Sequence, residues 1–287
     1  MAHKAAGYAS KSTLRQSMAS AVLYFWLAYK AMEKRFEYLH CEGSAAIPVV
    51  RLNRPKANAL NLAFIEEIIR MFQDLAHDEG VKAVVLTGEG NFFSAGLDVV
   101  EISGYDVARS EEFWHAFARM LEVLATFPKP FVCAINGHSP AGGCILAICA
   151  DHRVMAEGPF TIGLNEVPVG IVVPEPVFVL YSLWVGPRRA YQYLLQGKLL
   201  TPQEALEAGL VDAVVAQERV VPTALEIAGA YTKLDPDTVQ KTKRNLRKAF
   251  ERSIQGGFDS SFGETLRHWW SPGARAALMA LVQKLKK

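Results

Sequence analysis

The 287-residue sequence has few cysteines, and nothing in their spacing indicates that they pair or bind a metal. Its four cysteines, Cys41, Cys133, Cys144 and Cys149, form no CxxC motif and lie in or beside apolar runs. This pattern is typical of buried free thiols in a reducing compartment, rather than of disulfides. No group of histidines, cysteines or acids has metal-ligand spacing, so the sequence predicts no metal site.

Two further signatures are missing. The sequence contains neither a phosphate-binding P-loop nor the glycine fingerprint of dinucleotide-binding folds. The apolar run at residues 19–29 is too short to cross a membrane, so no membrane span is expected. Since 51% of the residues are hydrophobic and 21% are charged, the composition is that of a globular protein and excludes a largely disordered one.

Residues 1–31 contain no acidic residue and carry a charge of +4. Their lysines, arginine, serines and threonine are typical of a mitochondrial targeting segment, but they also fit a non-native extension that precedes Met32. We therefore treat residues 1–31 as an N-terminal extension of one of these two kinds. The matching locations are the mitochondrial matrix or, for a bacterial protein, the cytoplasm.

The remaining charge is unevenly distributed. Residues 32–240 carry −10 and residues 241–287 carry +8. A basic C-terminal segment on an acidic body predicts either an anionic partner or a solvated helix face. Its densest run consists of Lys241, Lys243, Arg244, Arg247 and Lys248.

Hydrophobic periodicity predicts a layered α/β core, because apolar strand-like runs alternate with amphipathic helices. We expect a core domain over residues 32–221 and a helical C-terminal domain over residues 222–287. A Thr201 cap, Pro202 and Glu204 mark the start of one helix, and Gly209 marks its end. The expected strands are 47–52, 82–87, 131–135, 153–156 and 210–215, and the expected helices are 62–76, 110–126, 141–150 and 201–208.

Three short motifs carry the chemistry. Two are glycine turns, Ser-Ala-Gly-Leu-Asp at residues 94–98 and Ser-Pro-Ala-Gly-Gly-Cys at residues 139–144. The third is a lone glutamate, Glu166, in Gly-Leu-Asn-Glu. Each glycine turn can direct a backbone N–H at a carbonyl oxygen, and a carboxylate can move a proton beside that carbonyl. The sequence therefore predicts a site for enolate chemistry.

These motifs belong to an ordered series that resembles the enoyl-CoA hydratase/isomerase (crotonase) superfamily over roughly residues 36–285. Further matching stretches are Pro-Lys-Ala-Asn-Ala-Leu-Asn at 55–61, Leu-Thr-Gly at 86–88, Pro-Lys-Pro at 128–130, Ile-Asn-Gly at 135–137 and Ala-Leu-Glu-Ala-Gly-Leu-Val-Asp at 205–212. The resemblance implies an α/β fold, a crotonase-like spiral of ββα repeats with a helical C-terminal region. It also implies assembly as a homotrimer or a hexamer made of two trimers.

Carried over by position, the resemblance implies that the backbone N–H groups of Leu97 and Gly142 form an oxyanion hole. Glu166 would be the catalytic acid and base, acting on an acyl-CoA thioester. No separate cofactor is expected, because CoA is part of the substrate. The basic C-terminal run could contact the 3′-phosphate of CoA. The implied substrate-binding residues are Lys56, Ala57, Ala59, Leu60, Ser94, Ala95, Gly96 and Ile145.

The number of acids in the pocket separates two activities. Hydratases of the superfamily use two glutamates to activate water, and Ile145 occupies the position of the first. The string Ile-Gly-Leu-Asn-Glu at residues 162–166 is similar to the mitochondrial-type Δ3,Δ2-enoyl-CoA isomerases, which move a double bond with one acid. We therefore expect an isomerase. The alternative is a hydratase, or another thioester-enolate enzyme, in which Glu166 acts together with Glu175.

A third hypothesis is a non-catalytic member of the family that binds acyl-CoA or RNA through the basic C-terminal segment. Clustered lysines and arginines permit contact with nucleic acid. However, no aromatic residues are interleaved with them and the chain has no recognised RNA-binding motif. No nucleic-acid partner is therefore expected.

Overall fold

The computed structural model describes residues 36–286 of the chain. The predicted extension at residues 1–31 lies outside these residues. From Tyr38 onward the chain forms one compact unit. None of the described helices is both long and apolar enough to span a membrane.

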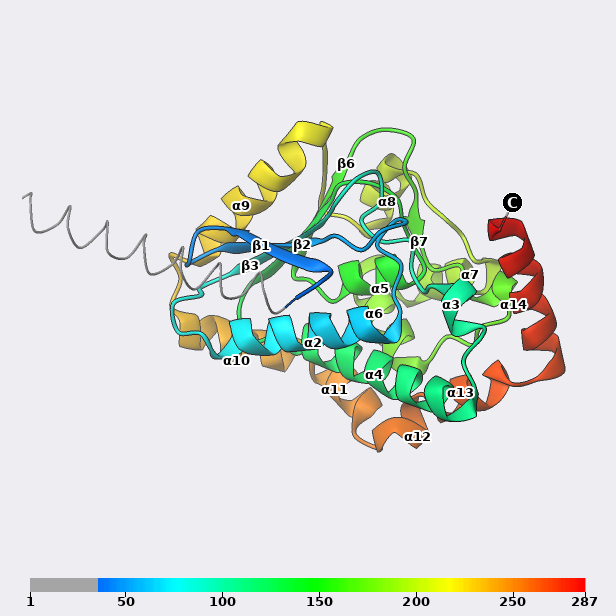
Figure 1. Cartoon of the computed structure of the whole chain (residues 1–287). Helices are drawn as coiled ribbons and strands as arrows, with labels where there is room; N and C mark the ends of the chain where they lie inside the picture. The colour runs from blue at the N-terminus through cyan, green and yellow to red at the C-terminus, as the bar shows by residue number, and fades with distance from the viewer. Residues whose placement is uncertain (1–35, 287) are drawn as a thin grey trace, which may run out of the picture. The chain divides into compact units, whose positions relative to one another are not determined.

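The described residues contain a six-stranded sheet with the order β1-β2-β3-β4-β6-β8. Figure 1 shows this sheet between α9 (Val220–Tyr231) and α2 (Leu62–His77), with β1, β2, β3 and β6 labelled. β1 runs antiparallel to β2, and every other neighbouring pair in the sheet is parallel. β3 and β4 are buried along their whole length, as strands covered on both faces must be. The strands are β1 (Leu39–Gly43), β2 (Pro48–Leu52), β3 (Val84–Gly88), β4 (Phe131–Ile135), β6 (His152–Ala156) and β8 (Ala213–Val215).

Helices surround this sheet. The longer ones in the core are α2 (Leu62–His77), α4 (Val107–Ala125), α6 (Glu175–Val185), α7 (Pro187–Gln196) and α9 (Val220–Tyr231). Shorter ones are α3 (Val99–Ile102), α5 (Gly142–Ile148) and α8 (Pro202–Ala208), with 3-10 turns η1 (Val167–Val169) and η2 (Gln217–Arg219). The chain ends in α10 (Pro236–Leu246), α11 (Lys248–Ile254), α12 (Gly257–Ser261), α13 (Gly263–Trp269) and α14 (Pro272–Leu285).

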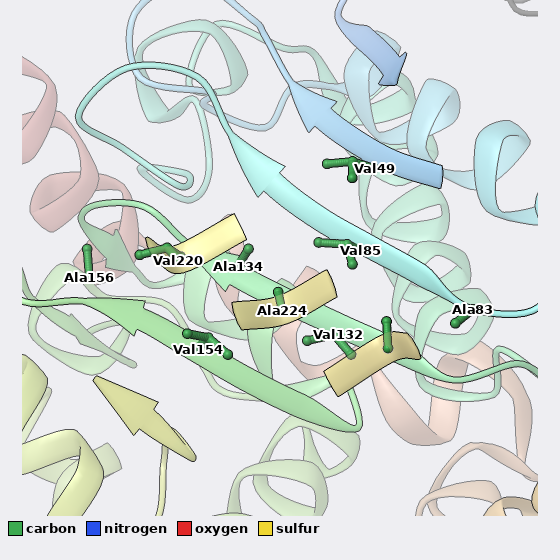
Figure 2. Packing of buried hydrophobic residues seen from close by; sticks show 10 residues of the cluster. Val49, Ala83, Val85, Val132, Ala134, Val154, Ala156, Val220 and Ala224 are labelled. Carbon is green, nitrogen blue, oxygen red and sulfur yellow. The ribbon is translucent and has the colours of Figure 1, made fainter. Parts of the chain in front are cut away.

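The two faces of the sheet are covered by different helices. On one face, small residues of α9 pack against valines and alanines of the strands (Figure 2). On the other face α2 packs through Phe72, whose ring lies 5.0 Å from that of Phe131. The buried residues of the α9 face are Val49, Ala83, Val85, Val132, Ala134, Val154, Ala156, Val220, Ala224 and Ala228.

A second, smaller layer of strand pairing turns this sheet into a spiral of ββα repeats. After β4 the chain forms β5 (Ser139–Pro140) and then α5, and after β6 it forms β7 (Ile162–Gly163) and then η1. β5 and β7 pair in parallel, and single bridges join Leu60 to Leu97 and Phe92 to His138. The predicted α/β fold, with its repeats and helical C-terminal region, is confirmed.

Most of the predicted elements are present, with one clear difference in extent. The strand expected at 210–215 begins only at Ala213. The residues before it follow the C-cap of α8, and the Leu210 carbonyl accepts a hydrogen bond from the side chain of Arg153 instead of a strand neighbour. The predicted capping box of Thr201 and Glu204 is present at α8. The domain boundary at residue 221 remains a prediction, and it falls at the start of α9, which packs on the sheet.

Candidate active site

One wall of the candidate site is a backbone ladder between the loop at residues 56–60 and the turn at residues 94–98. The Ala95 amide donates to the Ala57 carbonyl at 2.9 Å, and the Leu60 amide donates to the Gly96 carbonyl at 2.7 Å. The Asp98 amide then returns to the Leu60 carbonyl at 2.9 Å. The two segments are therefore held side by side, residue against residue.

The two glycine turns touch each other. A Cβ added to Gly96 would lie 2.9 Å from the Gly142 nitrogen, and one added to Gly143 would lie 2.2 Å from the Ser94 carbonyl oxygen. Gly96 also has a φ of +83°, which side chains disfavour. Glycine at these positions thus permits the close approach that places Leu97 beside Gly142.

The amides of Leu97 and Gly142 are available for an external acceptor. Neither donates a hydrogen bond within residues 36–286. Gly142 is the first residue of α5, where a helix N–H has no intrahelical acceptor. Two backbone donors of this kind, held in place beforehand, are the arrangement that stabilises a developing oxyanion.

The β5–β7 pair brings Glu166 to the same place. Pro140 pairs with Gly163, and the Ala141 amide donates to the Gly163 carbonyl at 2.8 Å. Gly142 lies two residues after the end of β5, and Glu166 lies three residues after the end of β7. The short second layer of the fold therefore joins the glycine turn at 139–144 to the segment that carries the carboxylate.

Glu166 is a buried carboxyl group without a polar partner. The residue is 6% exposed, and neither carboxylate oxygen has a hydrogen-bond partner among the described residues. Burial raises the pKa of Glu166 to about 7, and the dipole of its own backbone amide lowers that pKa by a smaller amount. A carboxyl group with such a pKa can accept and return a proton near neutral pH.

The surroundings of Glu166 are largely apolar. Ile145 and Cys144 lie on α5 and are 4% and 0% exposed. Burial raises the pKa of the Cys144 thiol, and the charge of Glu166 adds to this effect. Burial is also the main cause that raises the pKa of the fully buried Tyr181 of α6, and Cys144, Tyr193 and Glu166 add to it in that order. The thiol and the phenol are therefore neutral neighbours of the carboxylate.

The residues that follow Glu166 in the chain line an apolar cavity of about 400 Å³. Val172 and Val173, which precede α6, and Phe178 of α6 contribute to its walls. The other lining residues are Val167, Gly170, Ile171, Tyr191, Leu194, Leu195 and His268.

The residues predicted to bind substrate fall into two groups. Lys56 is exposed, and the small residues Ala57, Ala59 and Ala95 are half-buried. Leu60 and Ser94 are fully buried. The Ser94 hydroxyl donates to the Asn58 carbonyl at 2.8 Å, so its side chain faces the loop.

Other acids near the motifs have structural contacts. The Asp98 side chain caps α3 and pairs with Arg54 at 2.8 Å. Glu175, the alternative catalytic acid, is exposed at the first residue of α6. Asp151, which follows the end of α5, accepts a hydrogen bond from the Phe131 amide.

The basic C-terminal run is not the continuous cationic surface that its sequence indicates. Lys243 is buried and donates to Asp151 at 2.6 Å. Arg247 is 4% exposed and donates to the carbonyls of Cys149 and Ala150. The prediction that these two residues contact a CoA phosphate is therefore wrong, because both hold the end of α5. Lys241, Arg244 and Lys248 remain exposed.

Sequence reasoning missed Asn58 as a residue of this site. Its side chain is 1% exposed and makes several hydrogen bonds. The sequence could have indicated this residue, because Asn58 is a polar residue between Lys-Ala and Ala-Leu in the matching motif at 55–61. Among the described residues no group of three His, Cys, Asp or Glu side chains is arranged to hold a metal.

Comparisons with known proteins agree with this geometry. Residues 42–262 match the model of the family described as enoyl-CoA hydratase/isomerase. The mitochondrial enoyl-CoA delta isomerase 1 of Mus musculus is 40% identical over 210 residues, 72% of this chain and 73% of that protein. The 2,3-dehydroadipyl-CoA hydratase of Escherichia coli is 32% identical over 215 residues, 73% of this chain and 81% of that protein.

A solved structure is similar over nearly its whole length. The human mitochondrial delta3-delta2-enoyl-CoA isomerase superposes with a TM-score of 0.84 at 31% identity. The superposition covers 87% of this chain and 98% of that one. The chain therefore belongs to the enoyl-CoA hydratase/isomerase family and has the crotonase fold.

Proposed function

We propose that this protein moves the double bond of a 3-enoyl-CoA to the 2-position, with Glu166 as its single proton carrier. The observation that carries the proposal is the state of Glu166. It is buried, has no hydrogen-bond partner among the described residues, and has a pKa raised to about 7. The β5–β7 pair also joins its segment to the glycine turn that carries the Gly142 amide.

In this mechanism the thioester oxygen lies between the Leu97 and Gly142 amides. The Glu166 carboxylate removes a proton from C2, and the electron pair spreads into a dienolate whose negative charge is stabilised by the two donors. The same carboxyl group then returns the proton to C4, which leaves the double bond between C2 and C3. One acid suffices because it first accepts and then donates the same proton.

The surroundings of Glu166 favour double-bond migration over hydration. A hydratase needs a second acid to hold its water, and the apolar, buried Ile145 stands in that position. The other candidate, Glu175, is exposed. The printed names of the mouse and human relatives, both enoyl-CoA delta isomerases, support the same choice. The Escherichia coli hydratase, at 32% identity, keeps hydration as the second candidate.

The substrate is an acyl-CoA, and no separate cofactor takes part. The loop at 56–60 provides backbone contacts for CoA, with the exposed Lys56 available for a phosphate. The apolar cavity after Glu166 suits an acyl chain. We place the chain in homotrimers or pairs of trimers, as its resemblance to the superfamily implies.

The test is a direct comparison of two substrates. The purified protein is incubated separately with a 3-enoyl-CoA and with a 2-enoyl-CoA of the same chain length, and the products are separated by chromatography. The proposal expects conversion of the first to 2-enoyl-CoA, with little water addition to the second. Rapid formation of 3-hydroxyacyl-CoA from the 2-enoyl-CoA would show that the protein is a hydratase.

A further inference from the structure

Asn58 is a buried side chain that ties three backbone carbonyls together. Its amide nitrogen donates to the carbonyls of Glu89, Phe92 and Phe93 at 3.3, 3.1 and 3.2 Å. Its side-chain oxygen accepts from the Arg54 amide at 2.9 Å. This one carboxamide therefore connects the 54–58 loop to the residues that lead directly into the turn at 94–98.

The backbone around Asn58 is strained. Lys56, Ala57 and Asn58 have φ angles of 62°, 74° and 54°, a left-handed run of three residues without a glycine. Such conformations persist only where surrounding contacts hold them, and they gather at functional sites. The hydrogen bonds of the Asn58 side chain are contacts of this kind.

From the Asn58 carbonyl a chain of hydrogen bonds reaches the Gly96 amide, next to Leu97 in the sequence. The Asn58 carbonyl accepts from the Ser94 hydroxyl, and that hydroxyl in turn accepts from the Gly96 amide at 3.2 Å. Leu97 then lies between the Gly96 carbonyl and the Asp98 amide, which are both bonded to Leu60. The plane of the peptide that carries the Leu97 N–H is thus set by contacts with the 58–60 segment.

We propose that Asn58 is a positioning residue that aims the Leu97 amide at the thioester oxygen, an inference that rests on the proposed function. Arg54 provides a second tie, because its guanidinium bonds Asp98 at 2.8 Å and Glu101 at 2.9 Å. Asn58 itself is only 1% exposed, so it acts through the backbone and not by touching substrate.

The test variant is Asn58→Gly, which removes the side chain but keeps a residue that accepts positive φ. Because a small misplacement of a catalytic group costs up to about a hundredfold in rate, kcat should fall tenfold to about a hundredfold while KM changes little. The matched control is Thr201→Ala, which removes the cap of α8 and destabilises the protein without any contact with this ladder. If kcat fell equally in the control, the effect of Asn58→Gly would be explained by general destabilisation, and the positioning role would be overturned.

A spectroscopic measurement separates the two proposals. In a Glu166→Gln background, which prevents turnover, infrared spectra of a bound 2-enoyl-CoA with a ¹³C-labelled thioester carbonyl report how strongly that carbonyl is polarised. The shift to lower frequency on binding should be smaller in Asn58→Gly. An unchanged shift would overturn the role of Asn58, whereas no shift even with Asn58 present would overturn the proposed oxyanion hole.

Should Asn58→Gly fail to fold, Ser94→Ala tests the same hydrogen-bond chain one step further on. It removes the link between the Asn58 carbonyl and the Gly96 amide, and we expect a smaller fall in kcat with the same direction of infrared change. A folded Ser94→Ala protein with unchanged kcat and an unchanged carbonyl band would contradict the inference.

Discussion

A carboxylate lies near each end of α5, and the two carboxylates differ in whether they have polar partners. Beyond the C-terminal end, Asp151 accepts from the Phe131 amide at 2.8 Å and pairs with Lys243 and Arg247 at 2.6 and 3.6 Å. Beside the N-terminal end, Glu166 has no hydrogen-bond partner in the part of the chain that the structure describes. One helix thus separates a satisfied acid from an unsatisfied one.

The difference shows which acid holds the fold and which is available for chemistry. A buried charge without a partner is costly, so its retention needs a reason outside stability. A paired buried charge, in contrast, resists removal because its partners would be left unpaired. Asp151 therefore has a structural role, and Glu166 is available for the proton transfer that we propose. Each of the following variants tests one side of this comparison.

The largest expected effect is that of Glu166→Gln. The amide keeps the shape of the side chain but cannot accept a proton, and general acid–base catalysis contributes up to about 10⁴-fold. Isomerisation of 3-enoyl-CoA should fall by that order, while binding of acyl-CoA, measured by calorimetry, remains close to normal. A variant that retained most of its rate would remove Glu166 from the mechanism and make Glu175→Gln the next test.

Gly142→Pro should have the next largest effect, because it removes one of the two proposed donors. Proline is tolerated at the first position of a helix, where the N–H has no intrahelical acceptor. Loss of one oxyanion donor typically lowers the rate by about a hundredfold to a thousandfold.

Gly142→Ala is the control for this substitution, since it adds a Cβ but keeps the amide. That Cβ would lie 3.1 Å from both the Gly96 Cα and the Leu60 Cδ1, a tight contact that the proline shares. Circular dichroism should first show that both variants fold. Near-normal turnover in a folded Gly142→Pro protein would mean that the thioester is polarised elsewhere.

On the structural side of the comparison, Asp151→Asn should reduce stability and leave catalysis intact. The buried Lys243 and Arg247 would lose their anionic partner, and breaking a buried ion pair in this way costs about 3–5 kcal/mol. Urea unfolding gives the stability, and the rate is normalised to the folded fraction. A variant of normal stability with a low kcat would reverse the roles assigned to the two acids.

A smaller effect, about tenfold per pH unit, should appear in the pH dependence of the rate. In the proposed mechanism the ionised form of Glu166 is the base, and its pKa is about 7, so kcat/KM should rise with pH and level off above about pH 7. A midpoint near 4.5, the ordinary value for glutamate, would show that the carboxylate is solvated.

The same pKa makes the free energy of unfolding depend on pH. The folded-state pKa of Glu166 lies above the unfolded value. The stability that the protonated Glu166 contributes is therefore fully present below about pH 4.5 and is lost as the pH rises through about 7. Relative to Glu166→Gln, the parent should lose about 3 kcal/mol across this interval. Urea unfolding of both proteins at several pH values measures the difference.

Much of the fold and site was predictable from the sequence, and the exceptions have physical causes. Amphipathic periodicity located α2 and the capping residues located α8, because both signals are local. The β5–β7 pair was missed, since two-residue strands have no periodicity. Lys243 and Arg247 look like surface residues, and their burial depends on Asp151, which lies 92 residues before Lys243 in the chain. The absence of polar partners around Glu166 among the described residues likewise becomes visible only in three dimensions.

The central claim, that one carboxyl group carries the proton from C2 to C4 in an apolar pocket, can be tested with a labelled substrate. A 3-enoyl-CoA carrying two deuterium atoms at C2 is converted in ordinary water, and the product is analysed by mass spectrometry and NMR. The account predicts that a substantial fraction of the 2-enoyl-CoA carries deuterium at C4, because Glu166 returns what it removed. A product with hydrogen from water at C4 in every molecule would contradict it and would require a second, solvent-connected acid.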